Sequence, residues 1–277
     1  SILLLPSSSS EEVWSLPVLS ITELPETDSF SPIPPVTENL YLLFTSGSTG
    51  QPKGVPITIQ NVSSFLSSTR SIWHFTPEDR FLQMFELTFD LSVTSFLTPL
   101  VTGACCCIVP AGGMTFLMVA QTLEEADVTV ALMVPSVIQY LRPYFEEMQF
   151  PHLRICQFCG EALLAETVAG WEACVPNAVI ENVYGPTEAT IYCTRYTWEK
   201  EHSPAESING VVPIGTAIPG VETCLFSETG TVILNTEESG ELCLSGGQIT
   251  PGYWNAPAKN QEAFFMAQGK RFYRTGD

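Results

Sequence analysis

The sequence predicts an α/β protein, in which βαβ units build a layered parallel sheet and a small β-rich subdomain follows. From Asn39 onward, apolar runs of strand length alternate with amphipathic stretches of helical period, which is the pattern of βαβ units. After about Pro204, short β-type runs alternate with Gly, Asn and Glu turns. We therefore expect an α/β region over residues 1–203 and a β-rich subdomain over residues 204–277.

The expected strands follow from the apolar runs. Residues 1–6 indicate a short buried strand, and the Ser- and Pro-rich stretch that follows to Pro35 indicates a connection. In the α/β region, strands are predicted at Leu40–Phe44, Ala104–Val109, Val128–Met133, Leu153–Phe158 and Val179–Val183. In the β-rich region, strands are predicted at Val221–Phe226, Thr231–Leu234 and Glu241–Ser245.

Two helices are predicted between these strands. The first begins at Asp90, whose carboxylate suits a helix N-cap, and ends at Gly103. One face of this helix carries the apolar residues Val93, Phe96, Leu97 and Leu100. The second helix is predicted over Met114–Glu124.

Charge and cysteine content exclude several classes of protein. The 30 acidic residues outnumber the 11 basic ones and give a net charge of −19, which repels phosphate backbones and anionic lipids. We therefore expect no nucleic-acid partner and no membrane partner. The nine cysteines are an odd number and include the consecutive Cys105, Cys106 and Cys107. This pattern predicts buried free thiols and a cytoplasmic protein rather than a disulfide framework.

A loop with the composition of a phosphate-binding site follows the predicted strand at Leu40–Phe44. The segment from Thr45 to Gly54 reads TSGSTGQPKG. Its glycines let backbone N–H groups approach an anion, its hydroxyls donate hydrogen bonds, and Lys53 neutralises charge. The segment does not fit the GxxxxGK[ST] motif, so a Walker-type NTPase is not expected. The alternative is a flexible Ser/Gly turn.

Further motifs follow this loop, and they carry a resemblance to a known family. They are Phe89-Asp90-Leu91-Ser92, then Gly160-Glu161-Ala162, Asn182-Val183-Tyr184-Gly185-Pro186-Thr187-Glu188, Gly240-Glu241-Leu242 with Gly252-Tyr253, and Tyr273-Arg274-Thr275-Gly276-Asp277. With them the chain resembles the adenylate-forming superfamily, which includes amino-acid-activating domains of nonribosomal peptide synthetases, D-alanine–carrier protein ligases, acyl-CoA synthetases and luciferases.

The resemblance covers nearly the whole chain from about Asn39 and implies the large N-terminal adenylate-forming domain of that superfamily. The first residues are similar to part of an upstream subdomain. We expect the chain to be truncated at both ends. It would then be without the C-terminal subdomain, which supplies a further lysine in the family, and would be impaired on its own.

The resemblance also implies a site for ATP and Mg²⁺. The phosphates would be bound by Thr45, Ser46, Gly47, Ser48, Thr49, Gly50 and Lys53. The ring of Tyr184 would stack on adenine, and the nucleotide would be bordered by Gly160, Glu161, Ala162, Asn182 and Gly185. Thr187 would reach the α-phosphate, Glu188 would be the metal ligand, and Asp277 would accept both ribose hydroxyls.

Lys53, Thr187 and Glu188 would be the catalytic residues. Two of the implied roles have plainer alternatives. An aromatic residue at a strand end, such as Tyr184, is often part of the core, and a glutamate such as Glu188 is often a solvated surface residue.

Asp90 separates the subfamilies, because in members that handle α-amino acids this position is an aspartate that pairs with the substrate ammonium. A carboxylate in an apolar pocket is costly unless a cation arrives. The alternative role is a helix cap. By position, the rest of the substrate pocket would be lined by Leu91, Thr94, Ser136, Gln157, Cys159, Val183, Ile191 and Tyr192.

The motifs around Asp90 and Cys159 are most similar to the D-alanine–carrier protein ligases, which favours a small side chain. Gln157 and Tyr192 could equally bind a polar one. The sequence therefore predicts ATP-dependent activation of an amino acid to its aminoacyl-adenylate with release of pyrophosphate. Later transfer to the phosphopantetheine thiol of a carrier protein would follow. The alternatives are an acyl-CoA or aryl-CoA synthetase of the same fold, or a catalytically silent nucleotide-binding fragment.

Overall fold

The structure of this chain is a computed structural model that describes residues 3–5, 18–20, 37–45, 52–227, 230–233 and 238–277. The chain forms two compact units, residues 1–37 and residues 38–277. In the first unit, strand β1 (Leu3–Leu5) pairs in parallel with β2 (Val18–Ser20). The strand expected within residues 1–6 is therefore confirmed. The stretch expected to be a connection also contributes β2, which was too short to be recognised.

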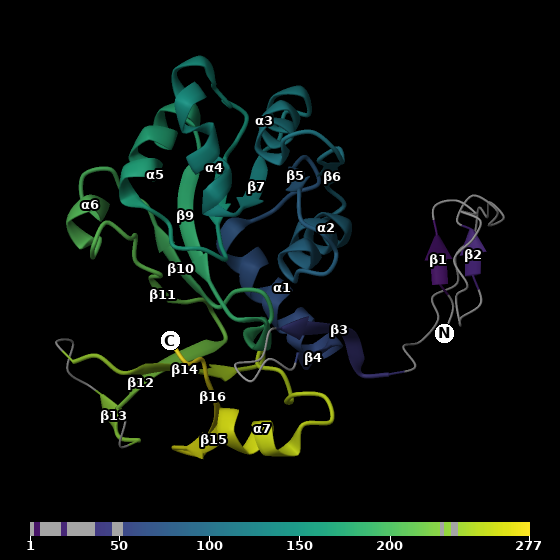
Figure 1. Ribbon diagram of the computed structural model, residues 1–277, viewed down its shortest axis with the longest axis vertical. Coiled ribbons are helices and arrows are strands. Elements are labelled where there is room, and N and C mark those ends of the chain that lie inside the picture. Colours follow the sequence, from purple (N-terminus) through teal and green to yellow (C-terminus); the bar gives the residue numbers. More distant parts are fainter. Residues whose placement is uncertain (1–2, 6–17, 21–36, 46–51, 228–229, 234–237) are drawn as a thin grey trace. The chain divides into compact units, whose positions relative to one another are not determined.

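The second unit contains a mixed sheet, the large sheet, whose strand order among the described residues is β11-β10-β9-β8-β7-β5-β6 (Figure 1). Its parallel strands are β5 (Arg80–Gln83), β6 (Cys105–Ile108), β7 (Val130–Met133), β8 (Ile155–Phe158) and β9 (Val179–Tyr184). An antiparallel edge is formed by β10 (Thr194–Thr197) and β11 (Thr216–Ala217). Four of the strands predicted in the α/β region are thus confirmed, whereas β5, β10 and β11 were not predicted.

Helices cover both faces of the large sheet. One face packs against α1 (Ile59–Trp73) and α2 (Leu91–Thr102), the other against α3 (Thr115–Glu125), α4 (Pro135–Leu141) and α5 (Ala165–Trp171). Neighbouring strand residues alternate between the two cores, as Phe81 and Leu82 do, because successive side chains of a strand point to opposite faces. Both predicted helices are confirmed, and Gly103 ends α2 in the left-handed conformation.

Shorter elements complete the second unit: η2 (Arg142–Glu147), η3 (Glu172–Cys174), η4 (Thr187–Ala189) and α6 (Ser203–Glu206). Within the described ranges, no helix combines the length and the apolar content needed to cross a membrane.

All nine cysteines lie among the described residues and are free, as the sequence predicted. Six of them are buried as predicted, whereas Cys106 and Cys224 are partly exposed and Cys105 is exposed, so the expectation of burial was wrong for these three. Cys156 and Cys159 have the Cys-x-x-Cys spacing of some redox pairs. Their side chains, however, belong to the two different hydrophobic cores on opposite faces of the large sheet. Both are therefore buried core thiols, and burial raises the pKa of Cys156 to about 12.

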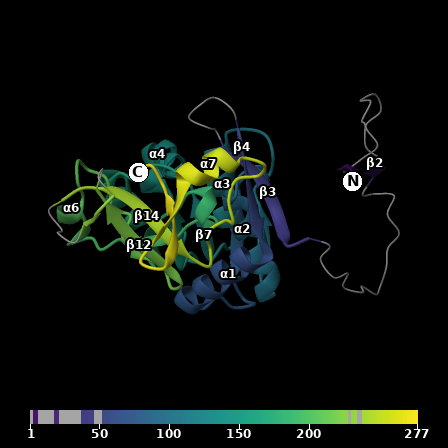
Figure 2. The ribbon, with the colours of Figure 1, turned by 90° about the horizontal axis from the view of Figure 1, so that it is seen from below.

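A separate antiparallel sheet, the small sheet, forms the β-rich part of the chain and is seen from below in Figure 2. Its strand order among the described residues is β13-β12-β14-β16-β15. Its elements are β12 (Val221–Phe226), β13 (Val232–Ile233), β14 (Glu241–Gly246), α7 (Pro257–Ala263), β15 (Phe264–Ala267) and β16 (Lys270–Arg274). The three predicted strands of this region are confirmed. Since β11 still belongs to the large sheet, the chain changes sheet between Ala217 and Val221, and the boundary at residue 204 stays a prediction.

The strand predicted at Leu40–Phe44 lies in a different place from the one expected. Strand β3 (Asn39–Thr45) pairs antiparallel with β4 (Lys53–Thr58) and is not part of the parallel sheet. Its side chains alternate between partly buried and exposed, and Phe44 is 64% exposed. The expectation of a parallel strand was wrong because the apolar run LYLLF contains no polar alternation that would mark a half-exposed hairpin strand.

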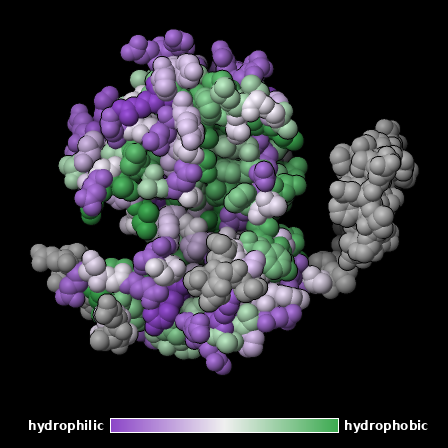
Figure 3. All heavy atoms as spheres, viewed as in Figure 1, coloured by the Kyte–Doolittle hydropathy of each residue, from purple (hydrophilic) through white to green (hydrophobic). Residues whose placement is uncertain are grey.

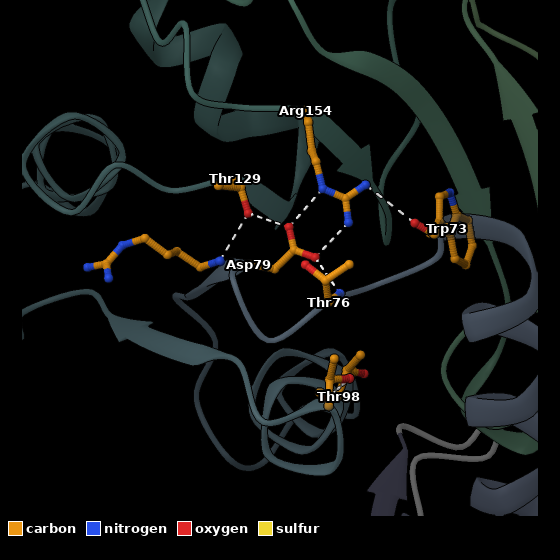
Figure 4. A network of polar contacts seen from close by, with 8 residues as sticks. Trp73, Thr76, Asp79, Thr98, Thr129 and Arg154 are labelled. Atoms are coloured by element: carbon orange, nitrogen blue, oxygen red, sulfur yellow. Dashed lines mark hydrogen bonds and ion pairs between the residues drawn. The ribbon is translucent and has the colours of Figure 1, made fainter.

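An ion pair between the buried Asp79 and the partly exposed Arg154 joins the amino ends of parallel strands (Figure 4). Asp79, just before β5, accepts hydrogen bonds from Arg154 Nε at 2.7 Å and Nη2 at 2.6 Å. It also accepts from Thr129 Oγ1 and from the Thr76 backbone, both at 2.8 Å. Burial alone would raise the pKa of Asp79, but the bonds from Arg154, Thr76 and Thr129 outweigh it and lower that pKa. The ionised carboxylate therefore ties β5, β7 and β8 together.

We predict that Asp79→Asn lowers the free energy of unfolding by about 1–3 kcal/mol, because it leaves the partly exposed Arg154 without its bidentate partner. A folded-state pKa below the unfolded value of about 3.9 adds stability above that pH, which is lost as pH falls through the folded pKa. The variant and the wild type should therefore converge in acid. Urea unfolding from pH 7 down to acid measures both effects. Asp127→Asn, which loses an exposed pair with His152 at 3.5 Å, is the control and should change stability by less than about 1 kcal/mol.

Candidate active site

The predicted functional residues follow the carboxyl ends of the parallel strands, where crevices of α/β sheets form. Asp90 lies beyond β5, Ser136 beyond β7, Cys159 and Gly160 beyond β8, and Gly185 beyond β9. The topology therefore brings to one edge residues that are distant in the sequence.

A cavity of about 420 Å³ opens at this edge. It is lined by Gly160, Glu161, Ala162, Leu163, Asn182, Val183, Tyr184, Gly185, Pro186, Val211, Val212, Ile214 and Asp277. The surface is hollowed here, between the large sheet and the small sheet and beside the C-terminus (Figure 3). All seven residues expected to border the nucleotide base and ribose thus share one cavity, whereas Thr187, expected at the α-phosphate, is not among its lining residues.

Tyr184 and Asp277 meet across this cavity. The Tyr184 hydroxyl donates a hydrogen bond to Asp277 Oδ2, and burial followed by this carboxylate raises the pKa of Tyr184. Asp277 is anchored as well, because its carbonyl accepts from Leu242 N at 2.9 Å and its N–H donates to Thr275 Oγ1 at 3.1 Å. Tyr184 is half-buried and faces the cavity, so it is not simply a core residue.

The sequence did not predict the part of the cavity wall that Val211, Val212 and Ile214 form. Asn182 donates from Nδ2 to the carbonyls of Val212 at 3.1 Å and Pro213 at 3.0 Å. These bonds fix the segment around Val212 against β9. The segment begins with a tight turn at Asn209 and Gly210, both with positive φ. Asn-Gly is the strongest short signal for such a turn, and it could have revealed that the apolar run after it folds back onto the site.

Glu188 is buried, which contradicts its alternative role as a solvated surface residue. Its Oε1 accepts a hydrogen bond from the Tyr253 hydroxyl at 2.7 Å, and Tyr273 lies beside the same carboxylate. The Lys53 ammonium lies 4.9 Å from the centre of the Tyr253 ring. Lys53 and Glu188 are therefore brought to one tyrosine, Lys53 over its ring and Glu188 at its hydroxyl, and this tyrosine lies between β14 and α7.

Asp90 occupies the N-cap position of α2, directly before Leu91, but its side chain does not cap the helix. Its backbone is already helical and its side chain makes no capping hydrogen bond, so the cap alternative is wrong. Among the residues that the structure describes, no donor bonds its buried Oδ2 atom. Burial raises the pKa of Asp90 to about 6, with Glu188 adding to the rise while Thr187 and the Leu91 backbone oppose it.

The other predicted substrate residues divide into two groups. Leu91, Thr94, Gln157, Cys159, Val183, Ile191 and Tyr192 are buried. Within this group the Tyr192 hydroxyl lies near Thr94 and Gln157, and burial raises its pKa. These three side chains and six neighbours enclose a space of about 10 Å³. Ser136 instead bonds Glu161, through its N–H at 2.8 Å and its Oγ at 3.1 Å. The Ser136 hydroxyl is thereby engaged with a residue of the 420 Å³ cavity.

The turn from Tyr184 to Tyr192 is tightly constrained. A Cβ atom on Gly185 would lie 2.4 Å from Tyr192 Cα, so only glycine fits. Thr190 and Ile191 both adopt positive φ, which is unfavourable for β-branched residues. The buried Gln248 holds this conformation by donating to the carbonyls of Ala189 at 3.1 Å and Tyr192 at 3.0 Å.

The structure describes only part of the predicted phosphate-binding loop. Thr45 ends β3 and Lys53 begins β4, and the two residues pair across the hairpin. Ser46, Gly47, Ser48, Thr49 and Gly50 lie outside the described residues. Their roles stay predictions, as do the ligand-binding roles of all the other residues of the site.

Comparison with known proteins shows which proteins this chain is similar to. The AMP-binding enzyme family model matches residues 5–254. The chain is 33% identical over 245 residues to a linear gramicidin synthase of Brevibacillus parabrevis, covering 86% of this chain and 5% of that protein. It is 32% identical over 249 residues to a D-alanine–D-alanyl carrier protein ligase of Bacillus cereus, covering 87% of this chain and 47% of that protein.

Several solved structures are similar in both sequence and fold. The adenylation domain AlmE of Vibrio cholerae, in complex with glycyl-adenosine-5′-phosphate, has a TM-score of 0.76 and 33% identity. The match covers 87% of this chain and 46% of AlmE. The chain thus spans less than half the length of each of these relatives.

We predict that Gly185→Ala displaces the turn from Tyr184 to Tyr192, because the added methyl group would overlap the Tyr192 backbone. The expected loss is about 2–4 kcal/mol of unfolding free energy, in the range of strained or overpacked substitutions. Gly170→Ala is the matched control, since its added Cβ meets only the Phe145 side chain at 3.1 Å. Thermal unfolding of both variants measures the difference, and equal stabilities would contradict the predicted constraint.

Proposed function

Because this chain belongs to the AMP-binding enzyme family, we propose that it activates a small amino acid as its aminoacyl-adenylate. The observation that carries the proposal is Asp90. Its Oδ2 atom is buried without a hydrogen-bond partner among the described residues, and burial raises its pKa. A buried carboxylate that lacks a cation is costly. The ammonium group of an amino acid would supply that cation, whereas a fatty acid would not.

The surroundings of Asp90 support a role in acid activation. Thr187 hydrogen-bonds Asp90, and Glu188 is close enough to raise its pKa. If Thr187 contacts the α-phosphate, as the family resemblance implies, an ammonium on Asp90 would place the substrate carboxylate near that phosphate. Tyr184 and Asp277 would bind the adenine and the ribose in the cavity between the two sheets. The nucleotide and the amino acid would then approach from two sides of the same turn.

The donor set at Glu188 fits Mg²⁺ held largely by substrate. Among the described residues, no group of three or more His, Cys, Asp and Glu side chains forms a cation cage. Mg²⁺ is commonly bound by one or two carboxylates together with phosphate oxygens and water. Glu188 would be that carboxylate, oriented by Tyr253. When bound, the ion would neutralise charge on the phosphates.

The proposed reaction needs positioning more than covalent participation of the protein. An oxygen of the substrate carboxylate attacks the α-phosphorus, the bond to the bridging oxygen of pyrophosphate breaks, and a mixed anhydride forms. Orientation and charge neutralisation dominate such transfers. Asp90 would orient the amino acid, and Lys53 would stabilise negative charge on the phosphates.

A small side chain is favoured by the packing of the predicted substrate residues. Tyr192, Gln157 and Thr94 are all buried, and with six neighbouring side chains they enclose a space of about 10 Å³. Such a space holds one water molecule at most, so a long side chain would have to displace this cluster. The glycyl-adenylate bound by AlmE and the D-alanine named for the Bacillus cereus ligase are consistent with a short substrate.

Transfer of the activated amino acid to a carrier-protein thiol is the proposed second step, supported by the names of the relatives. Amino-acid-dependent pyrophosphate exchange, measured in the protein at its natural length, tests the first step. Glycine, alanine and fatty acids offered in parallel separate amino-acid activation from an acyl-CoA synthetase. Nucleotide binding without exchange would favour a silent binding domain.

We predict that Asp90→Asn weakens amino-acid use by at least about 10-fold, because a charge-assisted hydrogen bond is worth about 1.5–3 kcal/mol. The KM for ATP should stay within twofold. Glu86→Gln, an exposed carboxylate of the same segment, is the control and should behave as wild type. Wild-type exchange by Asp90→Asn would exclude the ammonium-binding role.

The raised pKa of Asp90 predicts that the KM for the amino acid depends on pH. With its pKa raised to about 6, Asp90 is protonated below that pH and cannot pair with an ammonium. The amino-acid KM should therefore rise as pH falls below about 6, and it should stay flat in Asp90→Asn. Without substrate, a raised pKa favours the folded state at low pH, so the contribution of Asp90 to stability is lost as pH rises through about 6.

We further predict that Lys53→Ala and Glu188→Gln each lower the rate of adenylate formation by roughly 10–10³-fold, the range for removing one electrostatic contact to a transition state. Neither change should unfold the domain, which circular dichroism checks. Lys270→Ala removes a lysine from an exposed pair with Glu222 and should leave the rate unchanged. A variant that keeps the wild-type rate would remove its residue from the site.

A further inference from the structure

A second buried carboxylate lies directly behind the proposed substrate pocket. Glu181, in the middle of β9, is 1% exposed. Its Oε2 accepts from Trp73 Nε1 at 2.5 Å and from Gln157 Nε2 at 3.0 Å. Its Oε1 accepts from Arg195 Nη1 at 2.9 Å and lies 3.5 Å from Thr197 Oγ1. No role was predicted for this residue.

These donors come from three elements that converge on Glu181. Trp73 ends α1, Gln157 lies on β8, and Arg195 and Thr197 lie on β10. Gln157 and Thr197 are the register neighbours of Glu181 in the two adjacent strands. Arg195 balances the charge, and both oxygens have donors, so the carboxylate is satisfied as buried charges require.

Glu181 fixes the orientation of Gln157. The amide nitrogen of Gln157 donates to Glu181 at 3.0 Å, which holds the amide in one orientation. The Tyr192 hydroxyl lies near Gln157 and Thr94, whose side chains both affect its pKa. With six neighbouring side chains, these three residues enclose a space of only about 10 Å³.

We infer that Glu181 is a positioning residue that holds Gln157 and Tyr192 in one closed arrangement and thereby restricts the substrate to small amino acids. This inference rests on the proposed function. Glu181 contacts Gln157 from behind and would not touch the substrate. Without its charge, the Gln157 amide is free to rotate, Tyr192 loses a fixed partner, and the pocket opens to longer or more polar side chains.

Asp79 offers a matched comparison within the same sheet. It is also a buried carboxylate, 3% exposed, and it is also paired with an arginine and hydrogen-bonded by threonines. It ties the amino ends of the strands, whereas Asp90 follows the carboxyl end of β5. Removal of its charge should affect stability without affecting the choice of substrate.

The test is Glu181→Gln, which keeps the shape of the side chain and removes its charge. Exchange is measured with glycine, alanine, threonine and glutamine as substrates, together with the KM for ATP. The preference is the ratio of two kcat/KM values, that of the better of glycine and alanine divided by that of threonine or glutamine. We expect this ratio to fall by about 10-fold or more in Glu181→Gln. The KM for ATP should stay within twofold, and Asp79→Asn should keep the wild-type preference.

Two outcomes would overturn the inference. The first is an unchanged substrate preference in Glu181→Gln, whatever the stability of that variant. The second is an equal loss of preference in Asp79→Asn, which would indicate a general effect of destabilisation. If Glu181→Gln does not fold, Trp73→Phe removes one donor to Glu181 while keeping an aromatic ring, and it should shift the preference in the same direction. A wild-type protein without amino-acid-dependent exchange would instead refute the proposed function itself.

Discussion

The close approach of Gly185 to the Tyr192 backbone is the constraint on which the site depends. It forces the chain to reverse within a few residues after β9, and this reversal requires Thr190 and Ile191 to adopt unfavourable backbone angles. Gln248, in the turn after β14, compensates by bonding both ends of the strained segment. Since Thr187 and Glu188 lie on one side of the turn and Ile191 and Tyr192 on the other, one reversal positions the proposed phosphate contacts and the substrate wall together. The two sheets are thus joined at the point where the chemistry is proposed to occur.

Buried carboxylates in this unit differ in how fully they are satisfied, and that difference separates their roles. Asp79 and Glu181 each pair with an arginine and accept several further hydrogen bonds. Asp90 has no cationic partner within the described residues, and one of its oxygens has no donor. A fully satisfied carboxylate stabilises one arrangement of its neighbours, whereas an unsatisfied one retains free energy for binding a cation. This contrast is a stronger argument for a ligand at Asp90 than burial alone.

Four of the five parallel strands could be predicted because strands buried on both faces are mostly apolar runs, as at β7 and β8, whereas β5, with the sequence RFLQ, has polar residues at both ends. The same rule failed for β3, whose exposed Leu40, Leu42 and Phe44 are as apolar as its buried side. Sequence motifs identified most of the cavity residues and Asp90. They did not predict the contacts that determine the burial and the hydrogen bonding of these residues. The bond between Trp73 and Glu181 spans 108 residues, and the burial of Glu188 depends on Tyr253 and Tyr273. Such contacts follow from strand order and sheet packing, which no local pattern in this sequence encodes.

The charges around the turn explain why a cationic substrate and a metal would act together. Asp90 and Glu188 are close enough for one to raise the pKa of the other, so the pocket is already acidic before a nucleotide triphosphate enters. Like charges in a partly buried site repel strongly, since the local dielectric is lower than that of water. An ammonium on Asp90 and a metal ion beside Glu188 would each cancel one of these charges. Each ligand would then make binding of the anionic nucleotide more favourable, and thermodynamic linkage requires the nucleotide to favour both ligands in return.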